Sequence, residues 1–501
     1  MYRPASKATP QQGEFKLPFQ GKLSAQNRWV ILSELIPWSE FEGEYAQLFS
    51  AEMGAPAKSF RMALGALIIK EKLGISDRET VEQIKENPYL QYFIGLEEYS
   101  EDPPFEASML VHFRQRIQVN LVKRVNQRVV QKNQERISEV TQENSTEEKK
   151  VSEQKNRGKL ILDATCAPAD ITYPTDLKIL NAAREKTESI IDILHSEKSD
   201  SLKKKPRTYR RLARKDYLAV AKQRRPTRKV KRKAMRKQLQ YIKRNLGSIS
   251  ELIAGGAKLS SLNKTQYKSL LVIAEVYRQQ QWMWSNKKQS IPDRIVSITQ
   301  PHIRPIVRGK AGTAVEFGAK LSASCVDGYI FLDRISWDNF NESVDLKAQV
   351  EAYKEFTGFY PESVHVDKIY RTKENRAWCK ERGIRMSGPP LGRPRLDVSK
   401  EVKKQASEDE KIRNAIEGKF GQGKRRFSIG RVMAKLPDTA QTAIAITFLV
   451  MNLSRILRQI IWAFFCQFFP NVTFRGGKIK KSNRWVNERK KKLITPGYFI
   501  S

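Results

Sequence analysis

Up to residue 136 the apolar positions recur every three or four residues, a period that predicts helices rather than strands. Residues 60–73 carry such a stripe, and Gly74 then ends it. Ser76, with Glu79 three residues later, is the capping-box arrangement that starts a second helix. A helix, a glycine turn and another helix are compatible with a helix-turn-helix reader of DNA, and equally with two helices that pack on a shared core.

A third long helix is expected over residues 108–135, where it completes a helical bundle. Residues 137–157 are polar, rich in Glu, Gln, Lys and Ser, and show no apolar period, so we interpret them as a linker or a solvated helix end. The pattern thus predicts an N-terminal helical DNA-binding domain over residues 1–136.

Beyond the linker the pattern changes to that of strands. One short apolar run ends in Asp163 and a second one ends in Asp367, so each strand is expected to deliver a carboxylate to the edge of a sheet. Between them, residues 314–326 and 329–336 flank a Val-Asp-Gly turn, which predicts a hairpin. The fold class that follows is α/β.

We assign residues 158–176 and 291–440 to one α/β domain, interrupted by a helical insertion over residues 177–290. Residues 201–250 within this insertion hold 20 Lys or Arg and one acid, Asp216, on a helical apolar stripe. A basic face that is merely solvated would explain a lone cluster. The concentration of charge here favours binding to a phosphate backbone.

The most apolar stretch, residues 442–469, is interrupted by Arg455 and Arg458 and is therefore too short on either side to span a membrane. We interpret it as a buried pair of helices. Together with a basic tail over residues 475–492 it forms a C-terminal unit, residues 441–501. No apolar run or cleavage site of a secretory leader is visible at the N-terminus, so we expect a protein without a leader and without a membrane partner.

The chain has 92 Lys and Arg against 54 Asp and Glu, a formal charge of +38. Since 40% of its residues are hydrophobic, this is a folded protein with a large positive charge, and nucleic acid is the first candidate partner. The four Cys and four His are scattered without any CxxC pair, which argues against a zinc finger and against a disulfide scaffold. We expect a reducing compartment, the cytoplasm.

Two acids at strand ends are a modest signal, because such Asp residues often serve as turn or cap residues. A third acid, Glu417, lies one helical turn after Arg413, and an exposed ion pair would explain that spacing as well. With Lys424, however, these residues match the Tyr-x2-Arg-x3-Glu-x6-Lys signature, and the chain resembles the DDE insertion-sequence transposases of the families numbered four and five. Glu410 stands at the Tyr position, a departure from that signature.

Two further blocks support the resemblance. Asp367, Lys368 and Tyr370 are similar to the Asp-x-x-Tyr block of this group, and the residues after Asp163 are similar to its first strand and loop. The helical region that starts near residue 41 resembles the domain that precedes the catalytic domain. The match spans about residues 41–460, in order.

The resemblance implies a ribonuclease-H-like catalytic domain, a mixed sheet flanked by helices, with Asp163 on the first strand, Asp367 on the fourth and Glu417 on a later helix. These three acids would be the catalytic residues and would hold two Mg²⁺ ions, which Mn²⁺ can replace; carboxylate oxygen suits both. The residues expected to contact DNA are Arg413, Lys424, Lys368, Tyr370 and Arg376.

The function implied is that of a transposase, which binds the terminal inverted repeats of its element, cleaves double-stranded DNA and joins the freed end to target DNA. We expect a nucleoid-associated protein that forms a homodimer in the synaptic complex. The alternatives are a nuclease of the same fold that does not join strands, a non-catalytic DNA-binding protein descended from a transposase, and an RNA-binding polycation.

Overall fold

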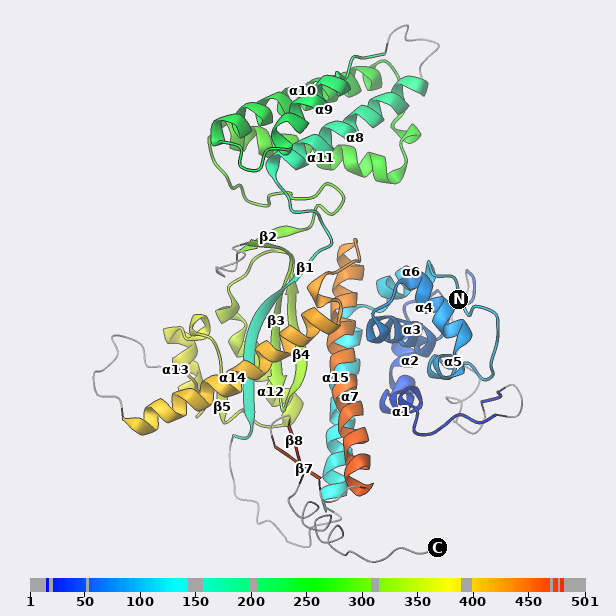
Figure 1. Cartoon of the computed structure of the whole chain (residues 1–501), viewed down its shortest axis with the longest axis vertical. Helices are drawn as coiled ribbons and strands as arrows, with labels where there is room; N and C mark the ends of the chain where they lie inside the picture. The colour runs from blue at the N-terminus through cyan, green and yellow to red at the C-terminus, as the bar shows by residue number, and fades with distance from the viewer. Residues whose placement is uncertain are drawn as a thin grey trace, which may run out of the picture.

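The computed structural model describes residues 15–17, 21–50, 54–142, 156–197, 205–307, 315–388, 399–468, 472–475 and 478–481. Its elements form three groups: N-terminal helices, a mixed sheet with covering helices, and a helical bundle that stands apart from the sheet (Figure 1). Most of the expected linker, and of the expected basic tail, lies outside the described residues.

The N-terminal group contains α1 (Arg28–Leu35), α2 (Trp38–Ala46), α3 (Phe60–Leu73), α4 (Asp77–Glu86), α5 (Pro88–Phe93), α6 (Met109–Arg116) and α7 (Val119–Gln142). The predicted helix over residues 60–73 is confirmed, and it ends at Gly74, whose φ of +70° suits glycine. The Ser76 hydroxyl accepts a hydrogen bond from the Glu79 N–H at 3.1 Å and caps α4.

The long helix expected over residues 108–135 is two helices instead. α6 ends at Arg116 and α7 begins at Val119, because Ile117 adopts non-helical backbone angles. The Ile117 side chain is completely buried. Burial of this residue in the core therefore outweighs the local preference for a continuous helix.

The central sheet contains β1 (Lys159–Pro168), β2 (Arg304–Val307), β3 (Val315–Val326), β4 (Tyr329–Ser336), β5 (Ser363–His365) and β6 (Arg385–Met386). Its order is β2-β3-β1-β5-β6, and β4 pairs with β3. β1 is antiparallel to β3 and parallel to β5, and β6 is parallel to β5. The predicted α/β class, with a mixed sheet, is confirmed.

β1 is longer than the sequence pattern indicated. Asp163 was expected at the end of a short strand, but it lies within the ten-residue β1, opposite Ala323 of β3. Small, strand-compatible residues follow it, and the 12-residue β3 offers a partner along their whole length. The hairpin is confirmed: β3 and β4 are joined at Asp327 and Gly328, both with positive φ, as a two-residue hairpin turn requires.

Helices α12 (Leu346–Thr357), α13 (Lys373–Glu381) and α14 (Lys400–Arg426) accompany the sheet, and α14 crosses β1 (Figure 1). Short 3-10 helices are η4 (Glu342–Val344), η5 (Lys368–Tyr370) and η6 (Ser428–Gly430). A small hairpin of β7 (Val472–Arg475) and β8 (Lys478–Lys481) follows near the C-terminus.

The expected pair of apolar C-terminal helices is wrong. The region forms one helix, α15 (Pro437–Phe468), because no glycine or proline interrupts it. By length and composition only, Pro437–Ala463 is the one helical segment in the described residues that could cross a membrane. Of its most apolar window, 67% is buried inside the protein.

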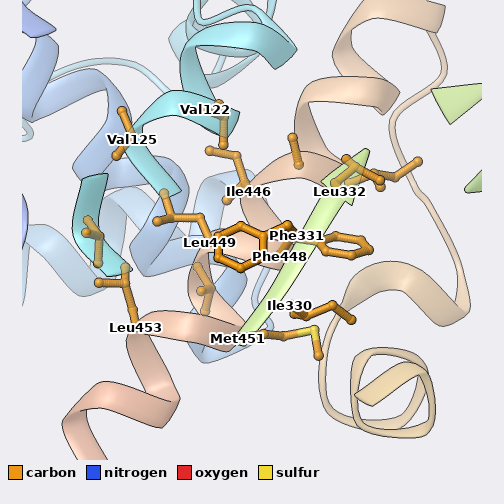
Figure 2. Close-up of a cluster of buried hydrophobic side chains, with 14 of the residues drawn as sticks. Val122, Val125, Ile330, Phe331, Leu332, Ile446, Phe448, Leu449, Met451 and Leu453 are labelled. Carbon is orange, nitrogen blue, oxygen red and sulfur yellow. The ribbon is translucent and has the colours of Figure 1, made fainter. Parts of the chain in front are cut away.

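α15 joins the N-terminal helices to the sheet. α7 and α15 lie side by side in Figure 1, between α1–α6 and the strands. Figure 2 shows the contact in detail: Val122 and Val125 of α7 and Phe331 of β4 converge on Phe448 and Leu449 of α15. All five side chains are buried, so one hydrophobic core runs across the two groups.

On the side of β4 that faces α7 and α15, the backbone N–H and carbonyl of Ile330 have no strand partner. The side chains of two asparagines bind them instead. The Asn452 side chain accepts from the Ile330 N–H at 2.9 Å and donates to the Ile330 carbonyl at 2.8 Å. It also donates to the Asn126 side chain at 3.0 Å. Asn126 also donates to the Ile330 carbonyl, at 3.3 Å, so the buried backbone groups of Ile330 are satisfied by side-chain amides.

The helical insertion forms a bundle of α8 (Asp176–Glu197), α9 (Arg210–Ala221), α10 (Arg228–Ala254) and α11 (Lys264–Ser285), with η3 (Leu259–Ser261). Apolar side chains of α8, α10 and α11 pack into cores separate from that of the sheet. The fully buried Arg184 donates to Glu188 at 2.5 Å and to Asn181 at 2.7 Å. The bundle therefore has an interior of its own.

Replacing Asn452 with alanine tests the link between helix and sheet. We expect Asn452→Ala to lower the free energy of unfolding by about 2–3 kcal/mol, because buried backbone groups of Ile330 lose their partner. Denaturant unfolding measures the change. Asn120→Ala, on the exposed side of α7, is the matched control and should change stability by less than about 0.5 kcal/mol. Equal effects of the two variants would contradict this role of Asn452.

Candidate active site

The three predicted catalytic acids line one cavity of about 850 Å³. Asp163, Asp367 and Glu417 are separated by up to 254 residues of chain (417 − 163), yet all three face this space. Two predicted DNA contacts, Arg413 and Lys424, line the same cavity. The structure thus brings together five of the eight residues that the sequence singled out.

Each acid reaches the cavity from a different element. Asp163 is part of the central strand β1, and its carboxylate accepts from the Ala164 N–H at 2.8 Å. Asp367 lies two residues after β5, where its carboxylate caps η5 by accepting from the Lys368 N–H at 2.6 Å. Glu417 projects from α14 and is 52% exposed. Strand pairing and the crossing of α14 over β1 therefore set their relative positions.

Arg413 binds two of the acids on its own helix. Its guanidinium donates to Glu417 at 3.0 Å and to Glu410 at 2.7 and 3.3 Å. Glu410 occupies the position where the transposase signature has Tyr, so here that position supplies a second carboxylate to Arg413 instead of a phenol. The hydrogen bond to Glu410 and the nearby charges of Glu417 and Asp367 raise the pKa of Arg413, which stays cationic.

Asp163 is the most strongly perturbed acid of the cavity. Burial raises its pKa to about 6, and the negative charges of Glu342 and Glu417 act in the same direction. The Ala164 N–H and the charge of Arg413 oppose this shift. A carboxylate held in this way is stabilised by any further positive charge that enters the cavity.

The donors that line the cavity fit a divalent cation such as Mg²⁺, which prefers carboxylate oxygen and keeps several waters. The raised pKa of Asp163 indicates that the cavity favours added positive charge. In this conformation, however, no group of three or more His, Cys, Asp or Glu side chains among the described residues is close enough to hold a metal ion. Glu417 points its carboxylate at Arg413 instead.

A fourth acid was missed by the sequence reasoning. Glu342, in η4, lines the cavity and forms an ion pair of 2.9 Å with Lys320 of β3, which is only 11% exposed. Lys320 also donates to the Phe340 carbonyl at 2.6 Å, so the pair is firmly placed. The sequence offers no periodic or motif signal for Glu342, because it follows the hairpin in a loop and reaches the cavity only in the folded chain.

The remaining expected DNA contacts differ in accessibility. Lys368 is exposed beside Asp367, whereas Arg376 is half-buried on α13 and does not line the cavity. Tyr370 is completely buried, and burial raises the pKa of its hydroxyl. A direct contact of Tyr370 with DNA does not agree with this structure. Its ring packs in the core beneath the cavity because η5 turns it inward.

The fold and the site define a class of protein: an α/β protein with carboxylates and basic side chains in one cavity. Comparison with known families is more specific. Residues 364–454 match the family described as Transposase DDE domain, and residues 17–116 match Transposase domain (DUF772). These two matches confirm the resemblance to DDE-type insertion-sequence transposases that the sequence shows. The first of these segments includes Asp367 and Glu417 but not Asp163.

One curated relative is an uncharacterized protein, ORF8 in the nfe locus of Rhizobium meliloti. It is 25% identical over 177 residues, which cover 35% of this chain and 79% of the relative. No solved structure matches the chain.

The perturbed pKa of Asp163 predicts a pH-dependent stability. Its folded pKa lies near 6, above the ordinary value of 3.8, so ionised Asp163 destabilises the metal-free fold. This cost is absent below pH 3.8, grows through the interval to pH 6 and is complete above it. We expect Asp163→Asn, which keeps the acceptor for the Ala164 N–H, to raise stability by about 1–2 kcal/mol at pH 7.5. Thermal unfolding in a chelator at pH 5 and 7.5 measures this gain.

Asp367→Asn is the matched control for this measurement. It too keeps the backbone cap, but Asp367 is exposed, so its replacement should leave the unfolding temperature nearly unchanged at both pH values. A gain for Asp163→Asn that is absent, or that is as large at pH 5 as at pH 7.5, would contradict the assigned cause.

Removing the negative charge of Glu342 should reduce the destabilisation that ionised Asp163 causes. We expect Glu342→Gln to lower the pKa of Asp163, so that Asp163→Asn stabilises less in the Glu342→Gln background than in the wild type. Unfolding of the two single variants and the double variant at pH 7.5 measures this coupling. Glu355→Gln, at an exposed position on α12, should show no coupling with Asp163→Asn. If the coupling energy of Glu342→Gln with Asp163→Asn were no larger than that of Glu355→Gln, Glu342 would lie outside the electrostatic environment of Asp163.

Proposed function

We propose that this chain is an active DNA transposase, which binds the terminal inverted repeats of its element and catalyses metal-dependent strand cleavage and strand transfer. The observation that carries the proposal is the convergence of Asp163, Asp367 and Glu417 on one cavity, in a chain with two transposase segments. Three acids this far apart in sequence share a cavity only through the tertiary fold. A common chemical task accounts for that arrangement.

Asp163, Asp367 and Glu417 would hold two divalent cations, Mg²⁺ or Mn²⁺ in its place. When bound, such ions lower the pKa of the attacking hydroxyl or water and stabilise the departing oxygen of a phosphodiester. The protein supplies fixed carboxylates for this purpose: Asp163 is held by β1 and Asp367 by its cap on η5. Glu417, on an exposed helix face, is the acid that must move away from Arg413 to join them.

Arg413 can release Glu417 without losing every partner, because Glu410 binds the same guanidinium. Arg413 and Lys424 then orient the anionic backbone, Arg413 by its planar fork and Lys424 as a point charge. Lys368 is exposed, next to Asp367 in the chain, and contributes a further phosphate contact. Cations on the cavity wall thus position DNA, while the acids carry the chemistry.

Strand order supports a ribonuclease-H-like catalytic domain. The path β4-β3-β1-β5-β6 has an antiparallel meander on one side of β1 and parallel strands on the other. If the short β2 is left aside, Asp163 belongs to the first strand and Asp367 follows the fourth, as the resemblance implies. We propose that residues 158–176 and 291–440 form this domain and that residues 1–136 form the domain that binds DNA ends. We also propose that the protein forms a homodimer at synapsis, in the nucleoid.

Individual replacement of the acids tests this proposal. Asp163→Asn, Asp367→Asn and Glu417→Gln should each reduce Mg²⁺-dependent cleavage of labelled end DNA by roughly a thousandfold, since each removes a ligand from a site that supplies several kcal/mol. Glu408→Gln, exposed on the same helix as Glu417, is the control and should cleave like the wild type.

The products separate the possible activities. Supplying end and target DNA together should yield joined product as well as cleaved product. Full cleavage by any one acid variant would remove that residue from the site. Cleaved DNA that is never joined would indicate a nuclease without strand transfer, and a wild type that binds DNA without cutting it would indicate a non-catalytic descendant.

A further inference from the structure

The bundle α8–α11 concentrates the charge of the molecule at a distance from the cavity. Residues 201–250 hold 20 Lys or Arg and one acid, so they carry +19 (20 − 1) of the total +38. The bundle stands apart from the sheet in Figure 1 and packs around cores of its own. Leaving out Lys203 and Lys204, 18 of these cations (20 − 2) lie within the described residues 205–250, on a folded scaffold.

The few acids of this region are already bound within the bundle. Asp216 accepts from Lys237 at 2.7 Å and from the Tyr241 hydroxyl at 2.9 Å. Asp192 of α8 binds Lys205 at 2.5 Å and Arg210 at 2.7 Å. These ion pairs hold α9 against its neighbours and already engage both of these acids.

That outer face is a continuous basic surface. Arg211, Arg214, Lys215 and Lys222 are exposed and, with Leu218, line a shallow hollow of about 430 Å³. Their spacing of three, four and seven residues places them on one side of the helix. In the described residues none of these four cations forms an ion pair with an acid. We call them the α9 basic face.

The surface continues beyond α9 in both directions. A second hollow of about 570 Å³ is lined by residues 205–212 and contains Lys205, Arg207 and the start of α9. Exposed Arg224, Arg225 and Lys229 extend the charge through the turn into α10. A helix of 12 residues is about 18 Å long, and over that length B-DNA presents about ten phosphate charges on its two strands.

We propose that the α9 basic face is a second DNA-binding surface, which holds the phosphate backbone of duplex DNA outside the catalytic cavity and without reading its sequence. Four cations on α9 and its C-terminal cap match a regularly charged rod. An anionic membrane would instead favour a broad apolar face with aromatic anchors beside the cations. Recognition of bases would need a helix that presents hydrogen-bonding side chains to a groove, whereas this face is almost wholly Lys and Arg.

This inference rests on the proposed function, because it takes DNA as the partner. It gives that function an additional role: DNA that leaves the cavity is held by the bundle, so a long flanking duplex binds more tightly than a short one. Binding through backbone contacts is measured by its salt dependence, with a slope of about 0.9 for each phosphate contact.

The experiment compares two triple variants of the full chain. Arg211→Gln, Arg214→Gln and Lys222→Gln remove three charges from the α9 basic face. Lys258→Gln, Lys264→Gln and Lys268→Gln remove three exposed charges from the start of η3 and from α11. Binding of a labelled 40-base-pair duplex without terminal repeats is measured without Mg²⁺ at several salt concentrations. Thermal unfolding verifies that both variants are folded.

We expect the α9 triple to reduce the slope of log affinity against log salt by about two to three, while the control triple keeps the wild-type slope. A variant with Arg211→Lys and Arg214→Lys should also keep it, because the charge is preserved. Unchanged slopes for the α9 triple, or equal losses in both triples, would overturn the proposal. So would an α9-dependent affinity for duplex RNA that exceeds the affinity for DNA.

Failure of this inference is distinguishable from failure of the proposed function. If the wild type cleaves end DNA but the α9 triple has a normal salt slope, only the second binding surface is wrong. If the wild type never cleaves DNA and yet shows an α9-dependent slope, the basic face remains a DNA-binding surface on a protein that is not an active transposase.

Discussion

Simultaneous pairing of β1 with β3 on one side and β5 on the other is the constraint on which the rest of the molecule depends. It buries β1 in the middle of the sheet, fixes Asp163 opposite Ala323, and brings the end of β5 to the same cavity. α14 can then cross β1 and add Glu417 and Arg413. A shift of this register by one residue would turn Asp163 to the other face of the sheet and would separate the acids.

The cavity balances opposite charges at close range in a protein that is strongly basic as a whole. Arg413 binds Glu417 and Glu410, and Lys320 binds Glu342, so the acids of the site are compensated by side chains of the chain itself. Asp163 has no such ion pair in the structure, and burial raises its pKa to about 6. Positive charge that enters the cavity would relieve the cost of ionising Asp163.

Two other parts of the molecule differ in physical character. The contact between α7, α15 and β4 is apolar and is completed by the Asn452 amide, so the N-terminal helices are held firmly to the sheet. The bundle α8–α11 has separate cores and an exposed basic face. One interface positions the N-terminal domain by hydrophobic burial, whereas the α9 basic face offers long-range attraction to a polyanion. Positioning of the N-terminal helices and attraction of a polyanion do not compete, because they depend on different elements.

Local patterns in the sequence determined the elements whose cause is local: the helix that ends at Gly74, the Asp327-Gly328 hairpin, and the spacing of Arg413 and Glu417 on one helix. Only the tertiary structure decided where β1 ends and that Tyr370 is buried, because each depends on partners distant in sequence. The same reason hid Glu342, a loop residue that joins the cavity only when η4 meets β3. Backbone periodicity is set by neighbours along the chain, whereas burial, pKa and convergence of charges are set by neighbours in space.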